Sequence, residues 1–445
     1  MLKALAHRPI ARLWFGQALS SIGDEIYRVG LTWMAVQTIG ADTGYLTAAQ
    51  FAALMILSFI GGKWADQWDP LRTLIGVDLL RAVIVVIPVV YSFFAPVPLS
   101  LLVGVALALA GLSAFFDPAL QTVLPRFAPD LYTLRAATGL MATTIRLARL
   151  VGPAVVGLLA GIIPVVHFFT IDALSFLISA CSVRGLSPRP EQQFKRPATA
   201  PGVWESITAG FRAVASRPGL GFIFTAKAIT GGTWNLAYCL GFALLAQELA
   251  PNDARTFGLL IAAYGLGNFA GALVVGNMHR ARPALMMFVG FAWLGIGFVG
   301  MALAPSLNLV MAAAAFAGFS GTMNEVTFFD LVQSRFPVSD MPKVLRLRMA
   351  TDNATTLVLM MMAPLILKVM SVRMVIGLCG GLWVLVGLMG CGSALHSIEN
   401  QELKPEPKPS PAARSPHSAP THVALPTPIG WSTRSDHAVN SAPVD

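Results

Sequence analysis

Charged residues are scarce in this chain. Asp, Glu, Lys and Arg make up 12% of its 445 residues, whereas about 25% is usual for a soluble domain. Hydrophobic residues make up 55%, and the mean hydropathy is +0.67. So little polar surface cannot face water on every side, which excludes an ordinary soluble domain. The composition instead predicts a membrane protein that crosses the bilayer several times.

Several chemical motifs are missing as well. The chain contains no G-x-x-x-x-G-K-S/T loop, so ATP hydrolysis within this chain cannot drive its activity. The histidines are scattered, and the four cysteines lie in apolar runs without metal-ligand spacing: Cys181, Cys239, Cys379 and Cys391. We therefore expect no enzyme activity, no metal site and no cofactor. The net charge of +9 lies in short segments between apolar runs, which argues against nucleic-acid binding.

Apolar stretches long enough to cross a membrane fill most of the chain. One transmembrane helix needs about 20 predominantly apolar residues. We expect an all-α polytopic membrane protein, with twelve transmembrane helices in two six-helix bundles. The expected spans are residues 13–38, 46–62, 73–94, 98–121, 138–161, 163–183, 219–245, 256–276, 284–304, 306–332, 348–369 and 372–395.

Basic residues are distributed unevenly between alternate loops. The N-terminal segment and the loops on its side carry nineteen Lys and Arg, whereas the other side carries only Arg255, Lys368 and Arg373. Loops rich in Lys and Arg stay in the cytoplasm. We therefore expect both termini to be cytoplasmic and the lipid bilayer to surround the spans.

Two changes in composition divide the chain into four parts. Residues 184–217 form the longest internal loop, and residues 203–215 within it place apolar side chains on one helical face. We expect an amphipathic helix there, lying on the inner leaflet with Arg212 and Arg217 toward lipid head groups. The Pro-rich end predicts a disordered cytoplasmic tail. The expected parts are a first bundle (1–183), a cytoplasmic linker (184–217), a second bundle (218–396) and the tail (397–445).

A repeated pattern relates the two expected bundles. Phe115-Phe116-Asp117 is followed after sixteen residues by Leu134-Arg135-Ala136-Ala137-Thr138. Phe328-Phe329-Asp330 is followed after the same interval by Leu347-Arg348-Met349-Ala350-Thr351, an offset of 213 residues. Internal similarity at about half the length of the apolar region indicates two related bundles in parallel orientation.

The segment after the second expected span carries a recognisable signature. Gly62-x-x-x-Asp66, with Arg72 six residues later, resembles the loop between helices two and three of the major facilitator superfamily. Gln67 and Asp69 stand where that family often has a basic residue and a glycine. The resemblance implies a cytoplasmic gate, in which Asp66 meets a helix N-terminus and Arg72 across the seam. Asp352, near the cytoplasmic side, is a further candidate gate residue.

The fifth expected span narrows the resemblance. It contains Arg149, Gly152-Pro153 and Gly157, which resemble the Gly-Pro motif of the exporter branches of the superfamily. Ser21-Ile22-Gly23-Asp24, Phe115 to Ala119 and Leu124-Pro125-Arg126 are similar to the branch that contains macrolide-efflux proteins and the enterobactin exporter. The resemblance covers about residues 8–395 and implies a multi-pass protein of a bacterial inner membrane. The basic motif common in helix four of the wider family is not evident.

Charged residues within the first expected span are candidates for ion coupling. Buried charges in a membrane usually face the bundle interior or a wet cavity. Asp24 and Arg28 share one helical face, and Asp24 or Glu25 could exchange a proton in the central cavity. The alternative is a permanently ionised Asp24–Arg28 structural pair. Arg146 and Arg149 are expected partners for Asp117 or Asp78, and Asp78–Arg81 is expected to be a scaffold pair.

The second half offers a smaller set of candidates. Glu325, beside Asn324, lies in the middle of its span and could bind a proton or attract a cationic substrate, while Lys227 could pair with an acid. Trp234 and Tyr238 could line the cavity, although for each of them singly a packing or lipid-facing role is the favoured alternative.

These observations favour a secondary active transporter: a proton-coupled, monomeric exporter of amphipathic small molecules such as drugs, macrolides or siderophores. An importer of a small nutrient on the same fold is the first alternative. The second is a non-transporting membrane scaffold that recruits partners through its tail. No residue pattern selects a particular substrate.

Overall fold

The computed structural model describes residues 2–65, 68–186, 203–276, 278, 282–337 and 340–393. Helices dominate these ranges, and no strand occurs within them, so the all-α prediction is confirmed. Eight described helical segments are long and apolar enough to cross a membrane. Their length and composition make this a multi-pass membrane protein. The count of twelve spans remains a prediction.

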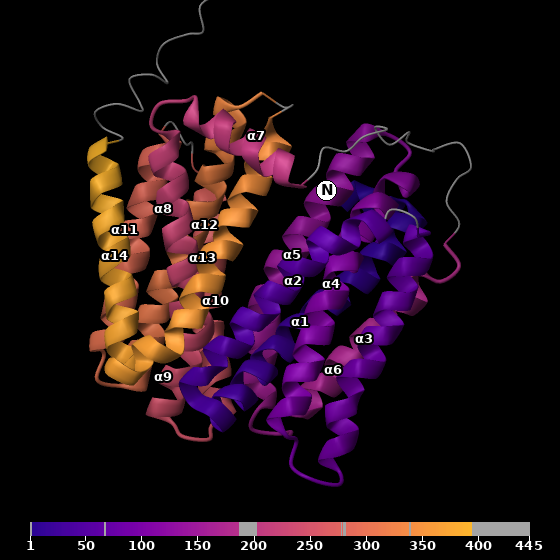
Figure 1. The fold of residues 1–445 in the computed structure, drawn as a ribbon, viewed down its shortest axis with the longest axis horizontal. Helices are drawn as coiled ribbons and strands as arrows, with labels where there is room; N and C mark the ends of the chain where they lie inside the picture. Colours follow the sequence, from indigo (N-terminus) through magenta and orange to yellow (C-terminus); the bar gives the residue numbers. More distant parts are fainter. Residues whose placement is uncertain are drawn as a thin grey trace, which may run out of the picture. The chain divides into compact units, whose positions relative to one another are not determined.

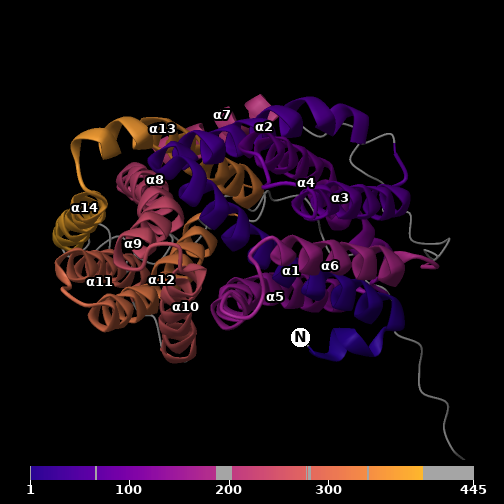
Figure 2. The same ribbon diagram turned by 90° about the horizontal axis from the view of Figure 1, so that it is seen from below.

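The helices of the first half follow the expected spans. They are α1 (Arg8–Ile39), α2 (Thr43–Ala65), α3 (Pro70–Ser92), α4 (Leu99–Phe127), α5 (Leu131–Leu159) and α6 (His167–Val183). Within this half, α6 packs against α1 and α3, and α4 packs against α2 and α3 (Figures 1 and 2). α1 is long enough to span a bilayer but carries three charged residues within one stretch, Asp24, Glu25 and Arg28.

After α7 (Val203–Ala215), the second half repeats the pattern of long helices. They are α8 (Leu220–Asn235), a π-helical segment (Leu236–Gly241), α9 (Phe242–Leu249), α10 (Ala254–Gly276), α11 (Pro283–Leu303), α12 (Leu307–Arg335), α13 (Met341–Val369) and α14 (Val372–Ser393). α8, the π-helical segment and α9 form one continuous apolar segment. α11 packs against α12 and α14, and α10 packs against α12.

Local capping sets where two of the helices begin. Asp69 accepts hydrogen bonds from the backbone N–H groups of Leu71 (2.9 Å) and Arg72 (3.1 Å), and Pro70 follows it at the first helical position of α3. Asp130 accepts a hydrogen bond from the N–H of Thr133 at 2.7 Å at the start of α5. This bond, together with one from the Thr133 hydroxyl, lowers the pKa of Asp130 below its ordinary value.

The two halves meet through close backbone contacts at one end of their helices. A Cβ at Gly258 of α10 would lie 2.5 Å from the backbone nitrogen of Gly157 in α5. A Cβ at Gly44 of α2 would lie 2.8 Å from the carbonyl oxygen of Met360 in α13. Trp33 stacks on Phe257 near the same end, at the C-terminal part of α1 and the start of α10. Glycine is needed at Gly258 because helix backbones this close leave no room for a side chain, and a Cβ at Gly157 would be tight, 3.1 Å from the backbone nitrogen of Leu259.

α7 lies at the other end of the second half (Figure 1). It packs on the first turns of α13, where a Cβ at Gly210 would lie 2.5 Å from the carbonyl oxygen of Lys343. Leu347, beside this contact, precedes Met360 by thirteen residues, which is roughly 20 Å along a helix. The described contacts between the halves and the docking site of α7 are therefore separated along α13.

The structure corrects the expected setting of α7. The helix occupies the expected residues, but Ile207 and Val214 pack in an apolar cluster with Val344 of α13 instead of facing lipid. Arg217 lies over the ring of Phe336, with Cζ 4.3 Å from the ring centroid. Burial against a neighbouring helix explains Ile207 and Val214 of the amphipathic pattern, whereas Phe211 is 64% exposed. Arg212 is exposed.

Replacement of Gly258 tests the contact between the halves. Gly258→Ala inserts a methyl group where the backbone of Gly157 lies, so α5 and α10 must separate at this end. We expect distances between spin labels on α5 and α10 at this end to lengthen relative to the parent protein. Gly221→Ala is the matched control, because a Cβ at Gly221 meets nothing within 4 Å. Unchanged distances in Gly258→Ala would contradict this account of the interface.

Candidate functional site

Glu25 of α1 is the centre of a charged group in the first half. Its side chain is only 10% exposed, and it accepts a hydrogen bond from Arg28 of the same helix. Arg149 of α5 approaches the same carboxylate, with Nε 3.7 Å from Oε1. Two guanidinium groups thus share one carboxylate, and their side chains remain 52% and 65% exposed.

The glycine of the helix-five motif makes this group possible. A Cβ at Gly152 would lie 2.4 Å from the Cβ of Glu25, so only glycine lets α5 approach α1 here. Pro153 follows it, and α5 continues as one helix through the proline to Leu159. One turn further, Gly157 contacts Gly258 of the second half. The motif therefore serves two contacts: one beside the charged group and one between the halves.

The structure differs from one pairing that was left open as an alternative and from one that was expected. Arg28 hydrogen bonds to Glu25, three residues before it, and not to Asp24. Arg149 pairs with Glu25 and not with Asp117 or Asp78. Helical spacing allows a partner at three or at four residues, and the side of α1 that α5 covers selects Glu25. Of Arg146, only the helical backbone is described.

Asp24 belongs to a second, more deeply buried set of acids around Arg81. Asp78 and Asp172 are 0% exposed and Arg81 is 4% exposed. Arg81 lies 3.9 Å from Asp78 and donates a hydrogen bond to Ser113 at 2.9 Å, so the expected Asp78–Arg81 contact is present. Arg81 is also the strongest electrostatic partner of Asp24. Among the described residues, Oδ2 of Asp172 has no hydrogen-bond partner.

Asp172 was missed by sequence reasoning. It lies alone in the apolar helix α6, without a second charge at helical spacing to draw attention to it. Close packing of α1 on α6 brings it to the cluster: a Cβ at Gly23 would lie 2.7 Å from its Oδ1. An isolated aspartate inside an apolar span was the available signal, because such a residue is costly to bury.

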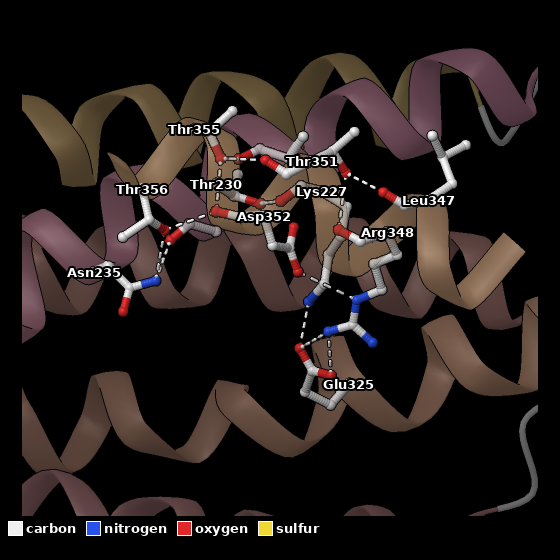
Figure 3. Close-up of polar contacts among 12 residues, drawn as sticks. Lys227, Thr230, Asn235, Glu325, Leu347, Arg348, Thr351, Asp352, Thr355 and Thr356 are labelled. Atoms are coloured by element: carbon white, nitrogen blue, oxygen red, sulfur yellow. Dashed lines mark hydrogen bonds and ion pairs between the residues drawn. The ribbon is translucent and has the colours of Figure 1, made fainter. Parts of the chain in front are cut away.

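The second half contains a four-residue ion-pair network (Figure 3). Lys227 of α8 donates to Glu325 of α12 at 2.5 Å, and Arg348 of α13 donates to both carboxylate oxygens of Glu325, at 2.9 and 2.7 Å. Arg348 also lies 3.4 Å from Asp352. Two cations are thus balanced by two anions. Phe328 lies beneath Arg348 at 4.7 Å.

Threonines and an asparagine hold α13 against α8 beside this network (Figure 3). The Thr355 hydroxyl donates to the carbonyl of Ala228 at 2.9 Å, and Asn235 donates to the Thr356 hydroxyl at 3.1 Å. Asn324 lies elsewhere: it is 4% exposed, and its Oδ1 would contact a Cβ at Gly290 of α11. The side chain of Asn324 therefore points toward α11, whereas that of Glu325 points toward α8 and α13.

Aromatic side chains lie opposite the Glu25 group. Trp234 and Tyr238 stack with ring centroids 4.5 Å apart, and the indole N–H of Trp234 donates to the Tyr264 hydroxyl at 3.0 Å. Tyr238 belongs to the π-helical segment, a geometry frequent at functional sites. Ile22 and Ile26 of α1 pack in the same apolar cluster as Trp234 and Tyr238, so the helix that carries Glu25 and Arg28 lies close to these rings.

The expected gate lies partly outside the described residues. Asp66 is not among them, and for Gly62 only its place in α2 is given. Arg72 is exposed in the first turn of α3. Asp352 contacts Arg348 within the second half. A gating role for these four residues therefore stays a prediction.

Paired charges and clustered aromatic rings inside tightly packed apolar helices are typical of membrane transporters. Among the described residues, no group of His, Cys, Asp and Glu could hold a metal ion. The sequence model of the transmembrane secretion effector family matches residues 2–338. The chain belongs to that family, within the major facilitator superfamily, and the predicted resemblance is confirmed. The family and its relatives are transporters, which confirms that the chain is not an enzyme.

Named relatives are efflux proteins and a siderophore transporter. The multidrug efflux pump Tap of Mycolicibacterium fortuitum is 25% identical over 321 residues, which cover 70% of this chain and 77% of Tap. The staphyloferrin A transporter of Staphylococcus aureus is 26% identical over 36% of this chain and 40% of its own length. Macrolide efflux protein A of Streptococcus pyogenes is 25% identical over 38% of this chain and 42% of its own length.

Solved structures share the fold. The POT family transporter PepTSo aligns with a TM-score of 0.64 at 12% identity, covering 89% of this chain and 99% of PepTSo. A bacterial homologue of the iron transporter ferroportin, in an inward-facing state, aligns with a TM-score of 0.63 at 13% identity, covering 86% of this chain and 98% of that protein. At these identities, the likeness concerns the fold alone.

Neutralising Glu325 tests the second-half network. Glu325→Gln leaves Lys227 and Arg348, which are 9% and 14% exposed, with less negative charge beside them. We expect a loss of stability of about 1–3 kcal/mol, seen as a melting temperature several degrees lower. Glu248→Gln, which breaks the pair with the 27% exposed Arg373, is the control and should cost under about 1 kcal/mol. Equal losses in the two variants would contradict a special role for the network.

Proposed function

We propose that this protein is a proton-coupled secondary exporter of amphipathic small molecules. Its twelve spans form two six-helix halves in a cell inner membrane, with both termini in the cytoplasm, and a single chain is the working unit. The halves alternate between inward-open and outward-open states around a site between them. Family membership and the efflux relatives support export, and the absence of a phosphate-binding loop supports an ion gradient as the energy source.

The observation that carries alternating access is the position of the described contacts between the halves. They gather at the end where α5 meets α10 and α2 meets α13. Arg28 of α1 and Arg149 of α5 lie away from these contacts, nearer the α7 side, and their side chains are exposed. When the two halves are in contact at one end and charged side chains are exposed away from that contact, the arrangement suits a state that is open on the α7 side. With the proposed topology, that side is the cytoplasm.

The acids around Arg81 are the proposed site of proton exchange. Asp24, Asp78 and Asp172 all interact with this one guanidinium group, and two of the three acids have no exposed surface. Burying three carboxylates around a single guanidinium group is costly, and binding a proton reduces that cost. Tyr27 and Asp117 also lie in the electrostatic surroundings of Asp24. Asp24, on the same helix as Glu25 and Arg28, connects the acids to the substrate side.

Asp24→Asn tests proton coupling. In everted membrane vesicles with an acidic interior, an exported compound that exchanges for protons dissipates the gradient reported by a pH-sensitive dye. We expect a panel of amphipathic drugs and siderophores to include compounds that do so with the parent protein, and at least tenfold more slowly with Asp24→Asn. Asp42→Asn, at an exposed aspartate between α1 and α2, should behave as the parent.

The same vesicles distinguish the alternatives. Equal dissipation by Asp24→Asn and the parent would overturn the assignment of Asp24. Accumulation of a substrate against its gradient in cells, without any efflux, would favour an importer. A scaffold would lose its activity when residues 397–445 are deleted, whereas the proposed exporter keeps transport after this truncation.

A further inference from the structure

The exposed guanidinium groups between the halves carry a surplus of positive charge. Arg28 and Arg149 share the single carboxylate of Glu25, so one positive charge there lacks a counter-charge in the group. Both side chains lie in the apolar helices α1 and α5 yet are more than half exposed. A charge placed within a membrane span usually faces water, a partner charge or a substrate.

The other charges near this surface are Asp24 and the ion-pair network of the second half. Asp24 interacts most strongly with Arg81, and Arg28 comes second. In the second half, the carboxylates of Glu325 and Asp352 lie against Arg348, and Lys227 completes that network. These four groups are balanced, so they do not compensate the surplus beside Glu25.

The face opposite the two arginines is aromatic. Trp234, Tyr238 and Tyr264 form a contiguous set of rings, with Tyr238 and Tyr264 centroids 4.9 Å apart. Trp234 and Tyr238 are only partly buried. Ile26 of α1 packs in one apolar cluster with Trp234 and Tyr238, and Arg28 lies on the same helix. A molecule bound there would contact rings on one side and guanidinium groups on the other. Planar guanidinium groups bind carboxylate or sulfonate through two parallel hydrogen bonds, and rings stack on rings.

We infer that the substrate of this site is an amphipathic organic anion, with a planar aromatic body that stacks on Trp234 and Tyr238 and an acidic group bound by Arg28 and Arg149. This inference rests on the proposed function as a small-molecule exporter and specifies its substrate class. A cationic drug would meet two like charges and a single carboxylate that is already paired, so the site discriminates against it. Glu25 limits the affinity for anions because it competes for both arginines.

Binding of two matched probes tests the charge requirement. Anilinonaphthalene sulfonate and N-phenylnaphthylamine share the same ring system, and only the first carries an acidic group. The full chain is reconstituted in nanodiscs, and saturable fluorescence is measured above that of empty discs. We expect Arg28→Gln or Arg149→Gln to raise the Kd of the sulfonate about tenfold, and the double variant about 100-fold. The Kd of the neutral probe should change less than about threefold.

The controls separate recognition from folding. Glu25→Gln releases both arginines and should lower the Kd of the sulfonate, a gain that a damaged fold does not produce. Arg28→Lys retains the charge and should lose less affinity than Arg28→Gln. Arg255→Gln changes the net charge equally at an exposed position of α10 and should leave both probes unaffected. Equal loss of both probes in the double variant, or no gain in Glu25→Gln, would overturn the inference.

Transport of the same probes separates this inference from the proposed function. In proteoliposomes under a proton gradient, both probes and the cation ethidium are followed. If the neutral probe or ethidium is transported while the sulfonate neither binds nor moves, the exporter stands and the anion inference fails. If the sulfonate binds with the expected dependence on Arg28 and Arg149 but no probe moves, the exporter proposal fails and the site remains.

Discussion

The close approach of α5 to its neighbours is the constraint on which the rest of this structure depends. Gly152 lets α5 lie against Glu25 of α1, and Gly157, five residues later, lets it lie against Gly258 of α10. Apolar side chains gain little from association within a lipid bilayer, so close packing between small residues must supply much of the contact. Two different sides of one helix thereby link a charged group in the first half to the contact with the second half. A change in that contact necessarily moves the backbone beside Glu25.

The two halves place their charges differently although they share a sequence repeat. Phe116 of the first copy lies beneath Arg81 of α3, and Phe328 of the second lies beneath Arg348 of α13. In each copy of the repeat an arginine therefore packs on a phenylalanine of the Phe-Phe pair. The arginine belongs to α3 in the first half and to α13 in the second. Around Arg81 the acids are in excess, whereas around Arg348 the two signs are balanced. This difference suits a division of roles, with proton exchange in the first half and a stable ion-pair scaffold in the second.

Much of the candidate site could be recognised from residue types but not from pairings. Intramembrane charge marked Asp24, Glu25, Arg28 and Glu325, because charged groups in apolar spans are rare. The alternative pairing of Arg28 with Asp24 is not the one observed. Helical spacing allows both Asp24 and Glu25 as partners, and the position of α5 decides between them. Lys227 and Glu325 are 98 residues apart, and their bond requires α8, α12 and α13 to pack in one particular rotation.

The sequence alone determined that the chain is a helical membrane protein of the major facilitator superfamily. Length, apolar periodicity and short motifs are local properties, so they placed the helices, including α7, close to their observed ranges. Only the tertiary structure decided that α7 packs on α13 and that Asp172 joins the acids around Arg81. It also decided that the helix carrying Arg28 lies close to Trp234 and Tyr238. These features depend on how each helix is rotated about its axis. Packing contacts between residues distant in the chain determine that rotation.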